Sequence, residues 1–208
     1  ERIKRQAARV YESLGKLGDA KEILSGVEQA SSLSLLSRIE ELSEWITDGY
    51  DLETSEVGQA DYYPEAGKIM YCVHSSQPFV NSGYTIRTEY VASSLKSHGF
   101  DVGVFSRWGF PTDREDYAGP DVLSKRYKIS GIDHVIDPHK KGMSGLKNQE
   151  YVNEAAQSLL KSALIFKPSL MYAASDHSIG LPAAIVASQL SIPFVYEMRG
   201  VWAYSRAA

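Results

Sequence analysis

The chain has 208 residues, of which 43% are hydrophobic, and it carries a formal net charge of −4 at pH 7. A chain of this size can bury one good core, and its pI near 5.8 with scattered Lys and Arg residues argues against a nucleic-acid-binding surface. The single cysteine, Cys72, excludes a disulfide framework and favours a reducing compartment, where we expect it to be buried and unreactive.

The chain begins with a helical segment, which we place at residues 1–48. Hydrophobic residues recur at helical spacing on both sides of a turn at 15–19, and this pattern predicts two antiparallel helices. A third helix is predicted at about 33–47, with its hydrophobic residues on one side. The first two helices resemble one tetratricopeptide unit, and the alternative is an ordinary helical hairpin that packs on another part of the protein.

Residues 49–67 differ in character from the segment before them. They are acidic, short of large aliphatic residues and interrupted by Gly and Pro, which is typical of a linker. We therefore predict a second domain over residues 68–208, with the boundary near residue 66. Because the chain starts without Met and ends without a closing element, we expect it to be a fragment of a longer protein.

Strand and helix patterns alternate in this second domain. Strands are predicted at 69–73, 101–106, 169–174 and 193–197, with shorter ones near 126–129 and 134–136. Helices are predicted at 84–97 and at 148–166. A further helix is predicted after the loop 175–180, with Pro182 in its first turn. Because strands joined through helices require crossover connections, the sequence predicts an α/β fold with a doubly wound, Rossmann-like parallel sheet.

The residues that follow the predicted strands are the candidates for a ligand site, because such sheets bind ligands at the carboxyl ends of their strands. They are residues 74–83, 107–113, 175–180 and 199–202. The loop before the helix at Tyr84 gathers free backbone N–H groups and the positive end of a helix dipole, where a phosphate would sit. No GxGxxG follows the first strand and no acidic residue ends the second, which disfavours a dinucleotide site.

The residue types of a metal site are dispersed. The five histidines do not cluster and the carboxylates lack ligand spacing. Asp113 and Asp116 are predicted to form a solvated loop face. We therefore expect no metal and no other cofactor.

Two stretches resemble a known family: SGYTIRTEYVASSLKSHGFDVGVFSRWGFPTD and YAASDHSIGLPAAIVASQLSIPFVYEMRG. They closely resemble the N-terminal domain of retaining glycosyltransferases of family four, which have the two-domain GT-B architecture. The resemblance covers about residues 68–206. In that family the N-terminal domain mainly holds the acceptor, and a C-terminal domain, absent from this sequence, binds the nucleotide-sugar donor.

The resemblance implies roles for individual residues. Ser82 and Gly83 match a Gly-rich turn whose backbone approaches the donor diphosphate. Many members of the family have a histidine after the strand predicted here at 169–174 that contacts the transferred sugar, and Ser175 stands at the matching position. Either His177 takes this catalytic-site role or the role is unfilled. The implied acceptor-binding residues are Asn81, Arg87, Arg107, Glu197 and Arg199. For Arg87, the alternative is a solvated arginine on the helix surface. For Glu197 and Arg199, the alternative is a structural ion pair.

The implied function is transfer of a sugar, with retention, from a nucleotide-sugar substrate to a glycan, lipid or metabolite acceptor. The fragment alone is expected to be inactive, since its own C-terminal domain is a required partner. We expect a cytoplasmic protein, and peripheral contact with the inner face of the membrane through loops 107–117 and 139–147 is an alternative to plain solvated loops. The alternative functions are a non-catalytic sugar-binding or protein-interaction module and half of a sugar-nucleotide epimerase.

Overall fold

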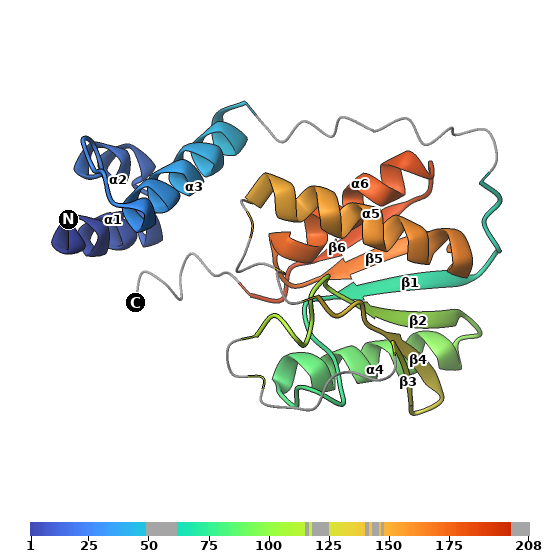
Figure 1. Ribbon diagram of the computed structural model, residues 1–208. Helices are drawn as coiled ribbons and strands as arrows, with labels where there is room; N and C mark the ends of the chain where they lie inside the picture. Colours follow the sequence, from blue (N-terminus) through green and yellow to red (C-terminus); the bar gives the residue numbers. More distant parts are fainter. Residues whose placement is uncertain are drawn as a thin grey trace. The chain divides into compact units, whose positions relative to one another are not determined.

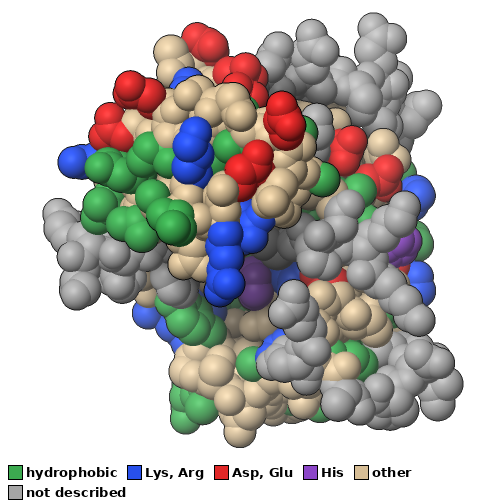
Figure 2. Space-filling view, turned by 60° about the vertical axis from the view of Figure 1, so that its left-hand side comes forward, with side chains coloured by type: hydrophobic (Ala, Val, Ile, Leu, Met, Phe, Trp, Pro, Cys, Tyr) green, Lys and Arg blue, Asp and Glu red, His purple; other side chains and the backbone are tan. Residues whose placement is uncertain are grey.

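The computed structural model describes residues 1–48, 62–114, 117, 125–139, 142, 146 and 148–200. The chain divides into two compact units, which are a set of three helices and a six-stranded sheet with its own helices (Figure 1). Within the described residues, no helix combines the length and apolar character that crossing a membrane would require. Figure 2 shows most of the acidic side chains (red) in the upper part of the view and a group of hydrophobic ones (green) at the left.

The first unit confirms the predicted helices. They are α1 (Arg2–Ser13), α2 (Leu17–Ile23) and α3 (Ala30–Thr47). Small and aliphatic side chains from all three helices and their connections form its core: Ala8, Ala20, Leu24, Val27, Leu35 and Ile39. The carboxylate of Glu1 accepts hydrogen bonds from the backbone N–H groups of Glu28 (2.9 Å) and Gln29 (3.0 Å), just before α3 begins. The core and this contact together hold the three helices as one unit.

The second unit contains the sheet. Its strands are β1 (Lys68–Val73), β2 (Asp101–Ser106), β3 (Arg126–Ile129), β4 (Ile132–Val135), β5 (Leu170–Ala174) and β6 (Phe194–Glu197). They are ordered β3-β4-β2-β1-β5-β6, and all neighbours are parallel except β3 and β4. The sheet is therefore mostly parallel, as predicted, and departs from the predicted parallel arrangement at this edge. Ser130 (φ 49°) and Gly131 (φ 76°) form a two-residue turn that joins β3 directly to β4 as an antiparallel hairpin.

Helices cover both faces of the sheet. α4 (Gly83–Ser97) lies on one face, and α5 (Asn148–Phe166) and α6 (His177–Gln189) lie together on the other (Figure 1). The chain passes from β1 through α4 to β2 on one side and later returns through α5 to β5 on the other side of β1. The arrangement is an α/β, Rossmann-like fold, and its strand order reverses between β1 and β5.

Two details differ from the sequence prediction. α6 begins at His177, capped by Asp176, so Pro182 lies inside the helix and not in its first turn. Residues 62–67, predicted as the end of a linker, contact the sheet unit. The Tyr62 hydroxyl donates to the carbonyl of Pro168 (2.6 Å), and the backbone N–H of Glu65 donates to the carbonyl of Lys167 (2.9 Å).

The central strand carries the core. From Ile69 to Val73 every side chain is buried, as expected for a parallel strand with helices on both faces. Cys72 is fully buried here, which confirms the expected environment, and its burial raises the pKa of the thiol. The neighbouring rings of Tyr71 and Tyr172 stack with their centroids 4.6 Å apart. β1 is thus a buried inner strand of the sheet, between β2 and β5.

Candidate functional site

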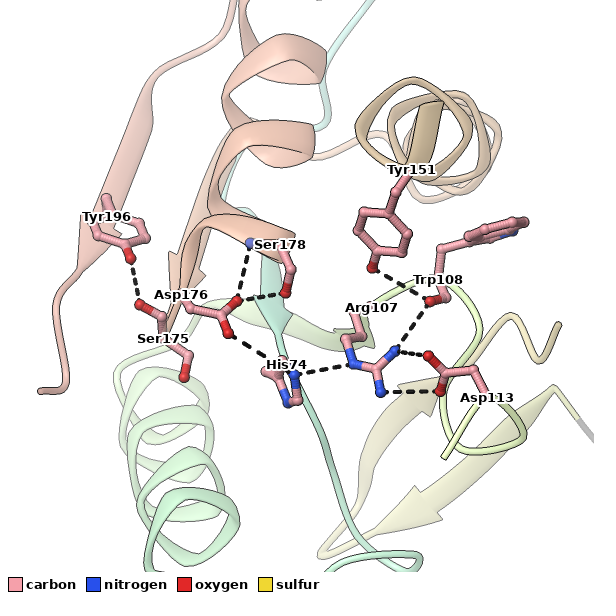
Figure 3. A network of polar contacts seen from close by, with 9 residues as sticks. All are labelled: His74, Arg107, Trp108, Asp113, Tyr151, Ser175, Asp176, Ser178 and Tyr196. Carbon is pink, nitrogen blue, oxygen red and sulfur yellow. Dashed lines mark hydrogen bonds and ion pairs between the residues drawn. The ribbon is translucent and has the colours of Figure 1, made fainter. Parts of the chain in front are cut away.

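Polar side chains from three loops meet at the carboxyl ends of the central strands (Figure 3). His74 follows β1, Arg107 follows β2 and Asp176 comes after β5. The reversal of strand order between β1 and β5 places these loops at the topological switch point, which is the usual ligand-binding position of a doubly wound sheet. We take this network as the candidate site.

A buried ion pair forms the centre of the network. The guanidinium of Arg107 donates to both carboxylate oxygens of Asp113, with Nη2 3.0 Å from Oδ1, and the two side chains are only 5% and 3% exposed. The chain turns back between them, because the N–H of Phe110 donates to the carbonyl of Arg107 and the N–H of Asp113 to that of Gly109. Bidentate geometry of this kind is among the stronger charge-assisted contacts in proteins.

This pair corrects one prediction and bears on another. The predicted solvated face is wrong for Asp113, since Gly142 packs so closely on its carboxylate that a side chain there would overlap it. Asp116 lies outside the described residues. Arg107 and Phe110 of the loop 107–117 are buried, while Trp108 and Arg114 are partly exposed, and contact of this loop with a membrane stays a prediction.

His74 lies between Arg107 and Asp176. Its Nε2 accepts a hydrogen bond from the Nε–H of Arg107 (3.2 Å), and the same nitrogen is 4.0 Å from Oδ2 of Asp176. Burial lowers the pKa of His74 below its ordinary value of 6.5, and the positive charge of Arg107 lowers it further, against the opposing effect of Asp176. The imidazole is therefore neutral at pH 7, with its proton on Nδ1 because Nε2 is an acceptor.

Asp176 also caps α6. Its Oδ1 accepts hydrogen bonds from the backbone N–H (3.0 Å) and the hydroxyl of Ser178. A carboxylate at this point already balances the positive end of the helix dipole. The preceding residue, Ser175, has a φ of 105°, which side-chain-bearing residues rarely adopt, and its carbonyl accepts a hydrogen bond from the Tyr196 hydroxyl. The β5–α6 loop is thus held from both sides.

Aromatic residues cover one side of the network. The hydroxyl of Tyr151, on α5, donates to the carbonyl of Trp108 (3.4 Å), which also accepts from Arg107 (3.4 Å). Burial raises the pKa of Tyr151 well above its ordinary value, so this hydroxyl stays protonated. The ring of Trp108 stacks on His139 at 4.7 Å. These contacts keep the Arg107 side chain away from solvent.

The predicted diphosphate-binding residues begin α4. Ser82 and Thr85 form a reciprocal capping box, with the backbone N–H of Ser82 2.9 Å from the Thr85 hydroxyl. Gly83 is the first helical residue, and a β-carbon added to it would meet nothing within 4 Å. Asn81 is exposed just before the cap. The backbone at Gly83 is therefore open on the side where a side chain would stand.

The other predicted acceptor residues form a second network. Glu197, at the end of β6, pairs with Arg87 of α4 (2.5 Å) and accepts hydrogen bonds from Arg199 (3.0 Å) and Tyr172 (2.9 Å). Arg199 is 3% exposed and also donates to the hydroxyl of Thr88 (2.9 Å). The structural ion pair weighed as the alternative for Glu197 and Arg199 is thus present, and it joins the end of β6 to α4. An acceptor-binding role for these residues stays a prediction.

His177 is separate from the first network. It is the exposed first residue of α6 and lines a shallow pocket with Asn148, Tyr151 and Val152. Among the described residues, the polar contacts that join His74, Arg107 and Asp176 do not include it. Its proposed sugar contact remains a prediction.

Sequence reasoning singled out Arg107 in the first network. It placed His74, Asp113 and Asp176 within its candidate loops without assigning them a role in binding, and it missed Tyr151. His74 and Asp176 carried a usable signal, because each is a titratable residue within two positions of the end of a buried parallel strand. Within the described residues, no three His, Cys, Asp or Glu side chains group as a metal site would need.

Comparisons with known proteins give no family. No protein-family model and no curated protein matches the chain. Two crystal structures of the C-terminal domain of a hydrogenase from Pyrococcus furiosus are similar to it. One is 12% identical with a TM-score of 0.42, over 66% of this chain and 96% of the other. The second is 10% identical with a TM-score of 0.42, over 68% and 98%. These values are too low to support a functional assignment.

Proposed function

We propose that the sheet unit is the acceptor-side, N-terminal domain of a retaining glycosyltransferase of the GT-B type. The observation that carries the proposal is the meeting of three polar loops at the switch point of the sheet, next to β1. The sequence resemblance, which spans the loops after β1, β2, β5 and β6, supports the same class of enzyme. The reaction would move a sugar from a nucleotide-sugar substrate to a glycan, lipid or metabolite acceptor in the cytoplasm.

The N-termini of α4 and α6 are suited to different groups. α4 is capped by the neutral hydroxyl of Ser82 and begins with the open backbone of Gly83, so its positive end is available to a diphosphate. α6 is capped by the carboxylate of Asp176, which repels an anion. We therefore assign the donor diphosphate to α4 and uncharged groups to the β5–α6 loop, with His177 as the sugar contact beside it.

The test uses the full-length protein and a panel of nucleotide sugars. Release of nucleoside diphosphate is followed with and without a cell-envelope extract as the source of acceptor. Release that depends on one donor and on the extract supports the proposal and names the sugar. Release of nucleotide or an epimerised sugar without any acceptor favours the epimerase. Binding of a sugar without release from any donor favours the non-catalytic module, and both of these results contradict the proposal.

A further inference from the structure

Two polar atoms of the candidate site, on the 36% exposed side chain of His74 and the 32% exposed side chain of Asp176, have no hydrogen-bond partner among the described residues. Arginine Nε is always a donor, so Nε2 of His74 must be the unprotonated nitrogen and Nδ1 must carry the proton. Among the described residues, Nδ1 has no hydrogen-bond acceptor and Oδ2 of Asp176 has no hydrogen-bond donor. Figure 3 shows the second ring nitrogen of His74 on the side of the ring away from Arg107 and Asp176. The site thus presents one donor and one acceptor.

Charges of both signs surround His74, and the carboxylate of Asp176 lies 4.0 Å from its ring. Arg107 and Asp113 neutralise each other through two hydrogen bonds, and both are buried. Asp176 adds a negative charge 4.0 Å from the ring, and Arg114 is the remaining charged group that acts on it. A hydroxyl can accept from Nδ1–H and donate to a carboxylate, whereas a phosphate or carboxylate ligand would face Asp176 as a like charge.

We propose that Arg107 and Asp113 act as positioning residues that hold His74 with its proton on Nδ1, and that His74 and Asp176 together bind an uncharged hydroxyl group of the ligand. Arg107, which the sequence assigned to the acceptor, then acts through His74 and does not touch the ligand. The hydroxyl belongs to the acceptor if the proposed glycosyltransferase function holds, so this part of the inference rests on that function. The proton position on His74 does not depend on it.

The first experiment determines that proton position. The full-length protein is labelled with nitrogen-15 in its histidines, and the signals of His74 are assigned by their loss in His74→Gln. We expect the Nδ1–H form in the wild type at neutral pH, and a mixture of both neutral forms in Arg107→Lys, which keeps the charge but loses the Nε–H donor. A proton on Nε2, or a charged ring at neutral pH, would overturn the inference.

Titration with inorganic phosphate tests the class of ligand. We expect the His74 signals to stay unchanged when phosphate is added, because Asp176 repels it. Saturable movement of these signals would show an anion-binding site and contradict the assignment of an uncharged hydroxyl.

A matched pair of variants tests contact with the ligand. In His74→Gln the amide oxygen reaches the position of Nε2 and can accept from Arg107, but no donor remains near Nδ1. In His74→Asn the amide nitrogen lies near Nδ1, but the contact with Arg107 is lost. We expect kcat/KM for the acceptor to fall about tenfold in His74→Gln and less in His74→Asn.

Stability should rank the two variants in the opposite order, with His74→Gln closer to the wild type in thermal midpoint. This crossed result separates contact with the ligand from a structural role. Wild-type kcat/KM in His74→Gln would overturn the inference. If the wild type itself transfers no sugar, the proposed function fails, and the proton position on His74 and the phosphate titration still decide the inference.

Discussion

Replacing Arg107 by Met should destabilise the sheet unit far more than replacing a surface cation. The side chains of Arg107 and Asp113 are 5% and 3% exposed, so the variant leaves a buried carboxylate without its partner. Breaking one side of such a pair costs about 3 to 5 kcal/mol. Lys125, which pairs with Asp137 at 2.8 Å but is 71% exposed, is the matched control. Lys125→Met should cost about 0 to 1 kcal/mol.

A double variant separates two costs: the loss of the attraction between Arg107 and Asp113, and the burial of a carboxylate without a partner. Arg107→Met with Asp113→Leu removes both charges and keeps similar volumes, and such replacements are often neutral. We therefore expect the double variant to be more stable than Arg107→Met alone. The coupling between the two sites would be at least about 2 kcal/mol, in line with residues in direct contact.

The assay is urea unfolding of the full chain, followed by the fluorescence of Trp108, which lies in the network. Trp45 and Trp202 are replaced by Phe in all variants so that one probe reports on the sheet unit. The reasoning fails if Arg107→Met costs no more than Lys125→Met. It also fails if the double variant is as unstable as the sum of its two single changes.

Three further predictions use other parts of the sheet unit. Gly83→Val should leave the unfolding midpoint close to that of the wild type and abolish transfer, because a side chain would fill the open space beside the α4 backbone; unchanged turnover would contradict this role. Burial alone would raise the pKa of Glu197, but hydrogen bonds from Tyr172 and Arg199 lower it below 4.5. Its stabilisation should therefore be complete above pH 4.5 and be lost as the pH falls through the lowered pKa, so the stability difference between wild type and Glu197→Gln should shrink in acid. Cys72 should resist thiol reagents in the native protein and react fully in urea, and rapid native reaction would argue against its burial.

The strands that the sequence predicts well are those whose burial is complete. From Ile69 to Val73 all side chains are buried, and an uninterrupted run of apolar residues bounded by polar ones marks such a strand without reference to any partner. The β3–β4 hairpin was harder to predict, because its strands are short and half-exposed. Ser130–Gly131 nevertheless carries the signal, since two consecutive residues with positive φ suit a two-residue hairpin turn.

The candidate site was predictable in position but not in its pairing. The ends of parallel strands lie at one edge of the sheet, so the loops after β1, β2 and β5 could be located from the sequence. Which side chains pair within these loops depends on backbone turns, and the spacing of hydrophobic residues in the sequence does not predict such turns. Asp113 reaches Arg107 only because the chain folds back through hydrogen bonds at Gly109 and Phe110. The same turn buries Arg107, and its predicted role in binding the acceptor stays a prediction.

Under the proposed function, the pairing of the arginines limits how the sheet unit would bind a charged donor. Arg107 is matched by Asp113, and Arg87 and Arg199 both contact Glu197, so these cations are engaged within the protein. An arginine already held by a buried carboxylate has little capacity left to bind a diphosphate, because releasing it would strand that carboxylate. Recognition of the diphosphate would then fall to backbone N–H groups at the start of α4, where a neutral serine caps the helix and Gly83 leaves the approach open. Transfer should therefore be more sensitive to a side chain at Gly83 than to loss of the exposed Arg87.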